Sequence, residues 1–182
     1  MMNIKNDVKE VLYSEEVISK RVKELGAEVS KDYEGKDLLV VGVLKGSIVF
    51  TADLIKAITI PCEIDFMAVS SYGKASESSG IVRILKDLDN DIEGKHILIV
   101  EDIVDTGTTL SYLLEYLKAR KAASIEIIAL LNKEARRKSN VTVKYSGFDV
   151  PDEFIVGYGI DYAEKYRNLP FIGSLKREIY EK

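Results

Sequence analysis

Two adjacent carboxylates, Glu101 and Asp102, separate an apolar segment from one rich in threonine and glycine. The apolar run 97–100 is too short for a typical helix and rich in β-branched residues, which predicts a strand buried on both faces. Because burying an unpaired carboxylate is costly, we expect the acidic pair to lie where this strand leaves the sheet. The following run 106–109 reads Thr-Gly-Thr-Thr and precedes an amphipathic helix with an apolar stripe of Leu110, Leu113, Leu114 and Leu117.

This unit carries the groups needed to hold a sugar phosphate. At a helix N-terminus the unpaired N–H groups and the helix dipole favour a phosphate, and the run 106–109 adds hydroxyls and a glycine that permits close approach. Glu101 and Asp102 offer acceptors that match the two donors of a vicinal diol, or that can reach a hydrated Mg²⁺. A ribose 5-phosphate has both a diol and a phosphate. Asp105 would then lie near the group attached to the anomeric carbon.

Each half of the unit also has an ordinary structural interpretation. The acidic pair alone is consistent with a solvated strand end, and the threonines alone with a helix cap. We favour a functional site because the two halves occur together. The sequence contains neither the Gly-Lys-Ser/Thr of a P-loop nor a G-x-G-x-x-G dinucleotide fingerprint.

The segment 97–109 resembles the phosphoribosyl-pyrophosphate motif of the type I phosphoribosyltransferases, most closely that of the hypoxanthine (hypoxanthine-guanine) phosphoribosyltransferases. Further motifs extend the resemblance, in order, from about residue 38 to about residue 173. It implies an α/β fold, with an open, mainly parallel twisted sheet flanked by helices, a small hood and a flexible hairpin lid. It also implies Mg²⁺-dependent transfer of a 5-phosphoribosyl group to N9 of hypoxanthine, and of guanine, with release of pyrophosphate.

The resemblance assigns a role to each residue of the motif. Glu101 and Asp102 hold the ribose hydroxyls and Mg²⁺, and Asp105 is the general base or acid at the purine imidazole. The residues implied for the 5-phosphate are Asp105, Thr106, Gly107, Thr108 and Thr109.

A second anion site is predicted at the turn Leu44-Lys45-Gly46. A lysine and a glycine between a strand and a helix can place a positive charge and open amides beside a phosphate, although Lys45 alone reads as an ordinary solvated lysine. In the resembled enzymes this turn binds pyrophosphate and contains a non-proline cis peptide, here between Leu44 and Lys45. The resemblance also implies that Arg167 contacts the pyrophosphate and that Asp161 helps to hold Mg²⁺ through waters. Without it, both would be interpreted as surface ion-pair partners.

The purine end of the site has its own candidates. The ammonium of Lys133, which follows a predicted strand, can donate to the exocyclic oxygen at purine position 6. Phe154 alone is consistent with a core position, but the resemblance implies that its ring stacks on the base, a contact worth about 1–3 kcal/mol. Ile155 would offer main-chain groups to the base edge. The neighbours of Lys133 are interpreted as a solvated charge run of Glu134, Arg136, Arg137 and Lys138.

The polar stretch 70–80, rich in serine and glycine, joins two predicted strands and cannot pack by itself. One interpretation is a disordered hairpin tip. The resemblance implies instead a lid that closes over the site, with Ser71 and Tyr72 ordering against the ligand. A lid that excludes water suits a reaction with an intermediate that water would destroy.

Alternating elements must position these groups. A helix is expected after Ser14, with an apolar stripe through Ile18, Val22, Leu25 and Val29, and another carries Ile48, Val49, Ala52 and Ile55. Right-handed crossovers between parallel strands place ligands at the carboxyl ends of the strands. His96 matches no ligand spacing and is expected to be structural. The predicted strands span 38–43, 63–69, 81–85, 95–100, 125–131 and 154–158.

Composition sets the outer bounds. The 182 residues, 46% hydrophobic and 31% charged, suit one domain over residues 1–182. Cys62, the single cysteine, excludes an intrachain disulfide and is expected in the core or near the surface. No segment has the pattern of a signal peptide or a membrane span, so we expect a cytoplasmic protein. The net charge of −4 gives no broad attraction for nucleic acid or an anionic membrane. A polyanionic substrate would therefore need local cations, amides and bound Mg²⁺.

Two alternatives stay open at this point. RNA-binding regulators of the pyrimidine-attenuator branch carry the same motif, but they have an aromatic residue where this chain has Asp105, and a basic surface that an acidic chain does not favour. A xanthine-directed phosphoribosyltransferase is the second alternative. The resemblance also implies a homodimer or homotetramer, whereas the sequence itself reveals no interface.

Overall fold

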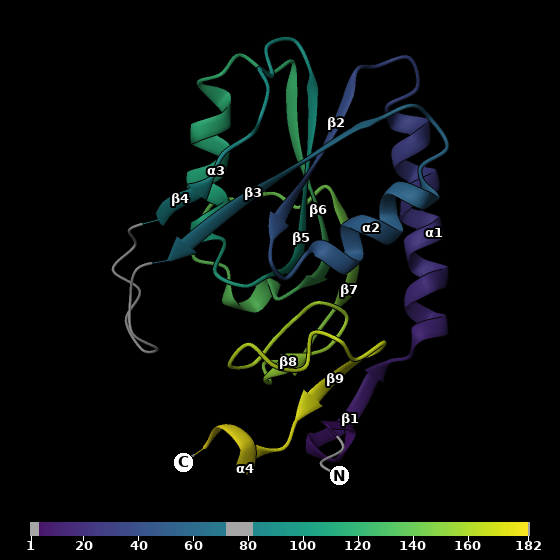
Figure 1. Cartoon of the computed structure of the whole chain (residues 1–182), viewed down its shortest axis with the longest axis vertical. Coiled ribbons are helices and arrows are strands. Elements are labelled where there is room, and N and C mark those ends of the chain that lie inside the picture. Colours follow the sequence, from purple (N-terminus) through teal and green to yellow (C-terminus); the bar gives the residue numbers. More distant parts are fainter. Residues whose placement is uncertain (1–3, 72–81, 182) are drawn as a thin grey trace.

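The computed structural model describes residues 4–71 and 82–181, and its main feature is a six-stranded sheet (Figure 1). The strand order is β4-β3-β2-β5-β6-β7. The five strands from β3 to β7 in this order are parallel, and β4 is antiparallel to β3, so the predicted open, mainly parallel sheet is confirmed. The strands are β2 (Leu38–Leu44), β3 (Glu63–Ser71), β4 (Val82–Lys86), β5 (His96–Val104), β6 (Ser124–Asn132) and β7 (Tyr145–Asp149).

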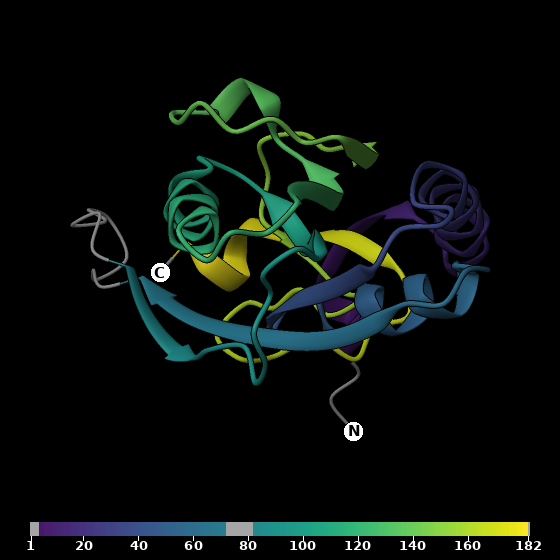
Figure 2. The ribbon, with the colours of Figure 1, turned by 90° about the horizontal axis from the view of Figure 1, so that it is seen from above.

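Three helices cover the two faces of this sheet: α1 (Glu15–Asp32), α2 (Ile48–Ala57) and α3 (Thr108–Lys118). Successive residues of a strand point to opposite faces. Accordingly Val40 belongs to the core under α1 and α2, whereas Val41 belongs to the core under α3. Figures 1 and 2 show α1 and α2 together on one flank and α3 on the other. Burial on both faces explains why the central strands are continuously apolar.

The helix predictions are confirmed with one correction. Ser14 caps α1 by accepting a hydrogen bond from the Val17 N–H (3.4 Å), and the predicted stripe of α1 is buried. In α2, by contrast, Ile48 is exposed, and the buried face is formed by Phe50, Thr51 and Leu54. The four apolar residues expected in this helix are therefore not its buried face, because most residues of α2 are apolar and the sequence does not define which face is buried.

A second, three-stranded antiparallel sheet lies at the end of the molecule toward which β2 runs (Figure 1). It consists of β1 (Val8–Tyr13), β9 (Ile172–Leu175) and β8 (Ile155–Val156), in the order β1-β9-β8. We call this sheet, which contains segments from both ends of the chain, the hood. Only β8 falls in a predicted strand, and 154–158 was wrongly expected as a longer one. Short elements complete the fold: η1 (Ile4–Asp7), η2 (Glu134–Arg136) and α4 (Arg177–Tyr180).

Two further sequence predictions are borne out. His96 is structural, since its Nδ1 is 2.7 Å from the Ser124 hydroxyl on the neighbouring strand. Cys62 is a half-buried free thiol near the surface, and burial raises its pKa. In the part of the chain that the structure describes, no helix is long and apolar enough to cross a membrane.

Candidate active site

The acidic pair lies inside β5 rather than beyond its end, which corrects the sequence prediction. Strand β5 continues to Val104, and Glu101, only 8% exposed, pairs in register with Ala129 of β6. The Ile103 N–H donates a hydrogen bond of 2.7 Å to Asp102 Oδ1. Sequence periodicity does not locate the end of β5, because the strand continues to hydrogen-bond with its neighbour β6 beyond the apolar run.

Among the described residues, neither carboxylate has a cationic partner. Burial, and then the charge of Asp102, raise the pKa of Glu101 well above its usual range. Burial raises the pKa of Asp102 to about 6, although the N–H groups of Ile103 and Asp102 and the charge of Arg167 act in the opposite direction. Within residues 4–71 and 82–181, no lysine or arginine forms an ion pair with either group. The pair is therefore well placed to bind hydroxyl donors or a cation supplied by a ligand.

The turn after β5 forms a cradle at the N-terminus of α3. Gly107 takes the left-handed conformation (φ 78°) as the N-cap residue, and α3 begins at Thr108. The Thr106 and Thr108 hydroxyls are 3.2 Å apart. A pocket of about 240 Å³ is lined by the acidic pair, by the turn Asp105, Thr106, Gly107, Thr108 and Thr109, and by Leu44 and Gly46. The structure thus brings together the residues predicted for the ribose and the 5-phosphate.

The turn Leu44-Lys45-Gly46 lies against Asp102. Its Leu44–Lys45 peptide bond is cis, as the resemblance implies. A Cβ atom on Gly46 would overlap the Asp102 carboxylate, so only glycine fits at this approach. The Lys45 ammonium lies 3.0 Å from Glu164 Oε2, and Lys45 does not line the pocket.

Arg167 and Asp161 form an ion pair of 2.8 Å between Nη2 and Oδ1. Arg167 Nη1 also donates to the Gly159 carbonyl oxygen (2.8 Å), and its Nε is buried with no partner among the described residues. Asp161 accepts a hydrogen bond from the Glu164 N–H (2.9 Å). The charges of both residues act on the pKa of Asp102, but neither residue lines the pocket that contains Asp102.

A second pocket, of about 500 Å³, adjoins the first and shares Ile103 and Asp105 with it. Lys133, Phe154 and Ile155, the three residues predicted for the purine, all line it. Lys133 is 8% exposed and donates to the Glu153 carbonyl oxygen (3.0 Å). The 49% exposed ring of Phe154 contacts the ring of Tyr180 at a centroid distance of 4.2 Å.

Asp105 stands at the junction of the two pockets. Its Oδ2 is 3.3 Å from Arg136 Nη1, which also lies 3.2 Å from Asp152. Its Oδ1 is buried with no partner in the described part of the chain. Asp105 thus lines both pockets and has one acceptor oxygen that no described residue satisfies.

Comparison with known proteins agrees with this geometry. Residues 9–163 match the phosphoribosyl transferase domain family. The chain belongs to this family. A hypoxanthine-guanine phosphoribosyltransferase of Bacillus subtilis (strain 168) is 56% identical over 178 residues, covering 98% of this chain and 99% of that protein. One of Staphylococcus aureus (strain Mu50 / ATCC 700699) is 57% identical over 175 residues, covering 96% and 98%. A crystal structure of a hypoxanthine phosphoribosyltransferase from Staphylococcus aureus superposes with a TM-score of 0.96 and 55% identity, covering both chains fully.

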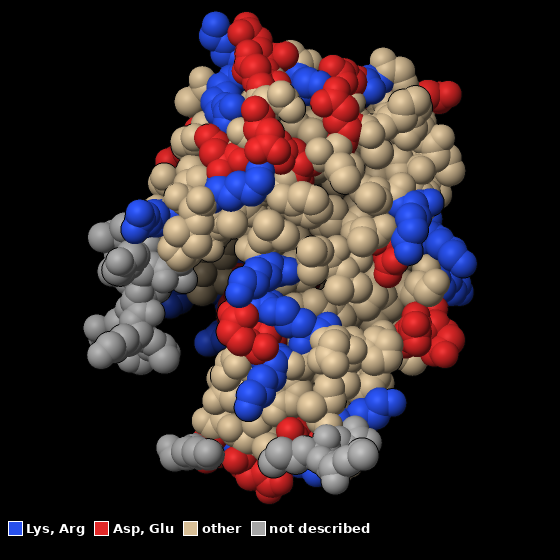
Figure 3. Space-filling model, in the orientation of Figure 1, with Lys and Arg blue, Asp and Glu red and all other residues tan. Residues whose placement is uncertain are grey.

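The phosphoribosyltransferase fold is thereby established, and neither alternative from the sequence, an RNA-binding regulator or a xanthine-directed enzyme, gains support. On the face seen in Figure 3, acidic and basic side chains are interspersed around a hollow. That face has no broad basic surface of the kind that binds nucleic acid.

Sequence reasoning missed one arginine of this phosphoribosyltransferase site. Glu134, Arg136 and Lys138 are exposed as predicted, but Arg137 is half-buried and holds three acceptors. Its Nε donates to the Asp105 carbonyl oxygen (3.3 Å), Nη1 to that of Val141 (2.8 Å) and Nη2 to Asn132 Oδ1 (2.5 Å). No signal in the sequence distinguishes Arg137 from its neighbours, because its partners lie on other elements.

The remaining predicted site residues belong to the lid. Ser71 is the last residue of β3, and Tyr72 lies outside the described residues. Their role therefore stays a prediction.

Proposed function

We propose that this chain transfers a 5-phosphoribosyl group from phosphoribosyl pyrophosphate to hypoxanthine, and to guanine, giving IMP or GMP and pyrophosphate. The observation that carries the proposal is the pair of adjoining pockets, one suited to a ribose phosphate and the other to a flat base, with Asp105 at their junction. The names of the bacterial relatives, similar over nearly their whole length, support the same reaction.

In this reaction the bond between C1 of the ribose and the pyrophosphate oxygen breaks, and a bond from C1 to purine N9 forms. Positive charge builds on the ribose ring as the leaving group departs. Glu101 and Asp102 would hold the ribose hydroxyls and lie near that charge, while the turn 105–109 anchors the 5-phosphate through its N–H groups and hydroxyls. Fixing the sugar at both ends orients the anomeric carbon for attack.

At the purine end, Lys133 would donate a hydrogen bond to the 6-oxo group. Phe154 would stack on the ring, and Ile155 would present its main chain to the base edge. As N9 attacks, the purine imidazole loses a proton, and Asp105, which lines both pockets, would accept it. The turn Leu44-Lys45-Gly46 and Arg167 would bind the leaving pyrophosphate.

Mg²⁺ is the cofactor that we propose for this site. Two adjacent carboxylates that form no ion pair within the described part of the chain are an oxygen donor set that a hard cation fits. No three His, Cys, Asp or Glu side chains form a ready metal cluster in the described ranges, so substrate oxygens and water would have to complete the coordination. Glu101 and Asp102 would hold the ion directly and Asp161 through water. When bound, Mg²⁺ would neutralise charge on the pyrophosphate and so make it a better leaving group.

We also propose that residues 1–182 act as one domain, that Ser71 and Tyr72 close over the bound substrates, and that the chain forms a homodimer or homotetramer in the cytoplasm. Its substrates are small molecules, with no nucleic acid or membrane partner. Light scattering of the purified protein measures the assembly, and a monomer at assay concentration would contradict that part of the proposal.

The reaction is tested by incubating the protein with phosphoribosyl pyrophosphate and Mg²⁺ and, in separate arms, hypoxanthine, guanine or xanthine. We expect nucleotide formation, followed by absorbance, with hypoxanthine and guanine, and little with xanthine. An arm with excess chelator should be inactive and should recover when Mg²⁺ is added in excess. Failure to form a nucleotide from any of the three bases would exclude the proposed function.

A further inference from the structure

Residues 157–159, which we call the arch, have an unusual backbone. Gly157, Tyr158 and Gly159 all adopt positive φ angles, of 99°, 51° and 101°. Glycine takes this conformation readily, but a residue with a ring side chain does not, so the surroundings of Tyr158 must hold it there. Its N–H donates to the Leu169 carbonyl oxygen (2.8 Å), and the Gly159 N–H donates to that of Arg167 (2.9 Å).

The arch touches both groups that we assign to the pyrophosphate. On one side, a Cβ atom on Gly159 would overlap the Gly46 carbonyl oxygen, so the two backbones are in contact. On the other side, the Gly159 carbonyl oxygen accepts a hydrogen bond of 2.8 Å from Arg167 Nη1. A shift of the arch would therefore move the turn at Gly46, the Arg167 guanidinium, or both.

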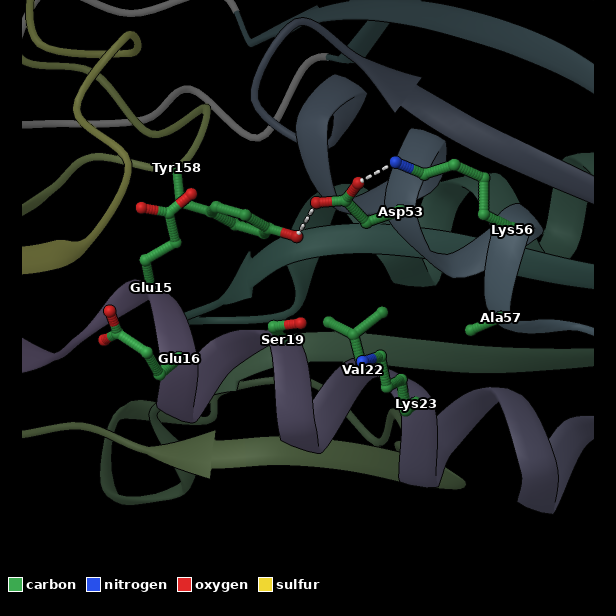
Figure 4. Close-up of a pocket in the computed structure, with 9 residues that line it drawn as sticks. All are labelled: Glu15, Glu16, Ser19, Val22, Lys23, Asp53, Lys56, Ala57 and Tyr158. Carbon is green, nitrogen blue, oxygen red and sulfur yellow. Dashed lines mark hydrogen bonds and ion pairs between the residues drawn. The ribbon is translucent and has the colours of Figure 1, made fainter.

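The side chain of Tyr158 extends away from this site and is fixed at its far end. It is 6% exposed, and its hydroxyl donates a hydrogen bond of 2.6 Å to Asp53 Oδ2 on α2 (Figure 4). Asp53 Oδ1 lies 2.6 Å from the Lys56 ammonium. Because α2 begins two residues after Gly46, this bond ties the arch to the helix that continues from the turn.

The tyrosine ring borders a cavity. The ring lines a cavity of about 490 Å³ between α1 and α2, whose other lining residues include Glu15, Ser19 and Val22 (Figure 4). The rest of the ring packs in the main core, so the core contacts and the hydroxyl bond to Asp53 together set its position.

The electrostatics favour this bond. Burial, and then the hydrogen bond to Asp53, raise the pKa of Tyr158, so the hydroxyl stays protonated and donates. Burial alone would raise the pKa of Asp53, but the hydrogen bonds from Lys56 and Tyr158 and the charge of Lys56 outweigh it and lower that pKa. Asp53 is therefore a charged acceptor, and such bonds are stronger than those between neutral groups.

We infer that Tyr158 is a positioning residue for pyrophosphate: through its hydroxyl bond to Asp53 it holds the arch, and with it Gly46 and Arg167, in the arrangement that binds the leaving group. The inference rests on the proposed function. Tyr158 touches no reacting atom. Its effect should therefore appear in the binding of phosphoribosyl pyrophosphate and pyrophosphate, and not in the binding of the purine.

The test compares Tyr158→Phe with Tyr145→Phe. Tyr145 is an equally buried tyrosine whose hydroxyl donates to Asp32 Oδ2 (2.7 Å), between β7 and α1 and away from the turn at Gly46. Loss of the Tyr158 hydroxyl should raise KM for phosphoribosyl pyrophosphate and Kd for pyrophosphate by about 5- to 20-fold, while KM for hypoxanthine stays within about twofold. Tyr145→Phe should lower Tm similarly and leave all three constants unchanged.

A double-mutant cycle checks the route. Asp53→Ala should raise the same two constants, and adding Tyr158→Phe should raise them little further, since both changes break one bond. If the two substitutions raise the constants independently, the inference is overturned. It is also overturned if the wild-type protein forms nucleotide and Tyr158→Phe leaves the Kd for pyrophosphate unchanged. A wild type that neither forms nucleotide nor binds pyrophosphate overturns both the proposed function and this inference.

Discussion

Asp105 lines both pockets, and its Oδ2 is held by Arg136. One oxygen is thus fixed by Arg136, while the other, Oδ1, is buried and has no hydrogen-bond partner among the described residues. A proton acceptor needs this arrangement, because it must be oriented without being consumed by an internal partner.

Asp105→Ala tests this role. We expect kcat to fall by about 10²- to 10⁴-fold, the range for loss of a proton-transfer group, with IMP binding much less affected. Steady-state kinetics and calorimetry with IMP measure the two effects. A variant with near-normal turnover would remove Asp105 from proton transfer.

Gly46→Ala tests the close approach of the turn to Asp102. The added Cβ would overlap the Asp102 carboxylate, so the turn or the acidic pair must shift, and we expect kcat/KM for phosphoribosyl pyrophosphate to fall by about 100-fold or more. Gly35→Ala is the control, because Gly35 has open space around it. That variant should lose some stability through its positive φ but keep its activity. Equal kinetics for the two variants would contradict the importance of this contact.

At the scale of elements, the cradle at the N-terminus of α3 depends on a separate segment, the one that follows η2. The Thr106 carbonyl oxygen accepts hydrogen bonds from the N–H groups of Lys138 and Ser139 and from the Ser139 hydroxyl. Arg137 holds the Asp105 carbonyl oxygen. The segment after η2 therefore supports the turn from behind and keeps its N–H groups directed toward the pocket.

Arg137→Gln tests this support. Three hydrogen bonds are lost together, and we expect KM for phosphoribosyl pyrophosphate and Kd for IMP to rise by about 10-fold, since both ligands carry the 5-phosphate. The adjacent exposed Lys138, changed to Gln, is the control and should behave like the wild type. If both variants bind IMP with wild-type affinity, Arg137 is not needed by the cradle.

The elements differ in how far the sequence predicts them. The central strands are predictable because burial on both faces makes them continuously apolar. The resemblance implies a small hood, but periodicity does not reveal its strands, because β1 pairs with β9 from the opposite end of the chain and β8 has only two residues. The same contrast holds in the site: Glu101, Asp102 and the turn 105–109 are contiguous and form a motif, whereas Arg137 acquires its role only from tertiary contacts.

At the scale of the whole molecule, both ends of the chain meet beside the purine pocket. Arg177 and Tyr180 of α4 line that pocket, and β9, just before α4, pairs with β1. Phe154, which directly precedes β8, contacts Tyr180. The pocket proposed for the base is thus lined jointly by the hood with α4 and by the end of the main sheet at Lys133, whereas the pocket proposed for the ribose phosphate is lined by segments of the main sheet.

Tyr180→Ala tests this division. Removing the ring that contacts Phe154 should raise KM for hypoxanthine by about 3- to 10-fold and leave KM for phosphoribosyl pyrophosphate unchanged. Tyr112→Ala is the control, because Tyr112 is an exposed tyrosine of α3 that faces another ring, that of Tyr116, outside the purine pocket. A parallel rise in both Michaelis constants for Tyr180→Ala would contradict the division.

The pairing of β1 with β9 has a mechanical consequence. Val8, at the start of β1, pairs with Leu175, at the end of β9, so a force that pulls the two termini apart acts on the hydrogen bonds one after another. Such unzipping geometry resists load weakly compared with strands that must shear along their length. Under tension the hood would therefore unfold first and binding of the base would be lost, while the parallel sheet and its phosphate cradle were still folded.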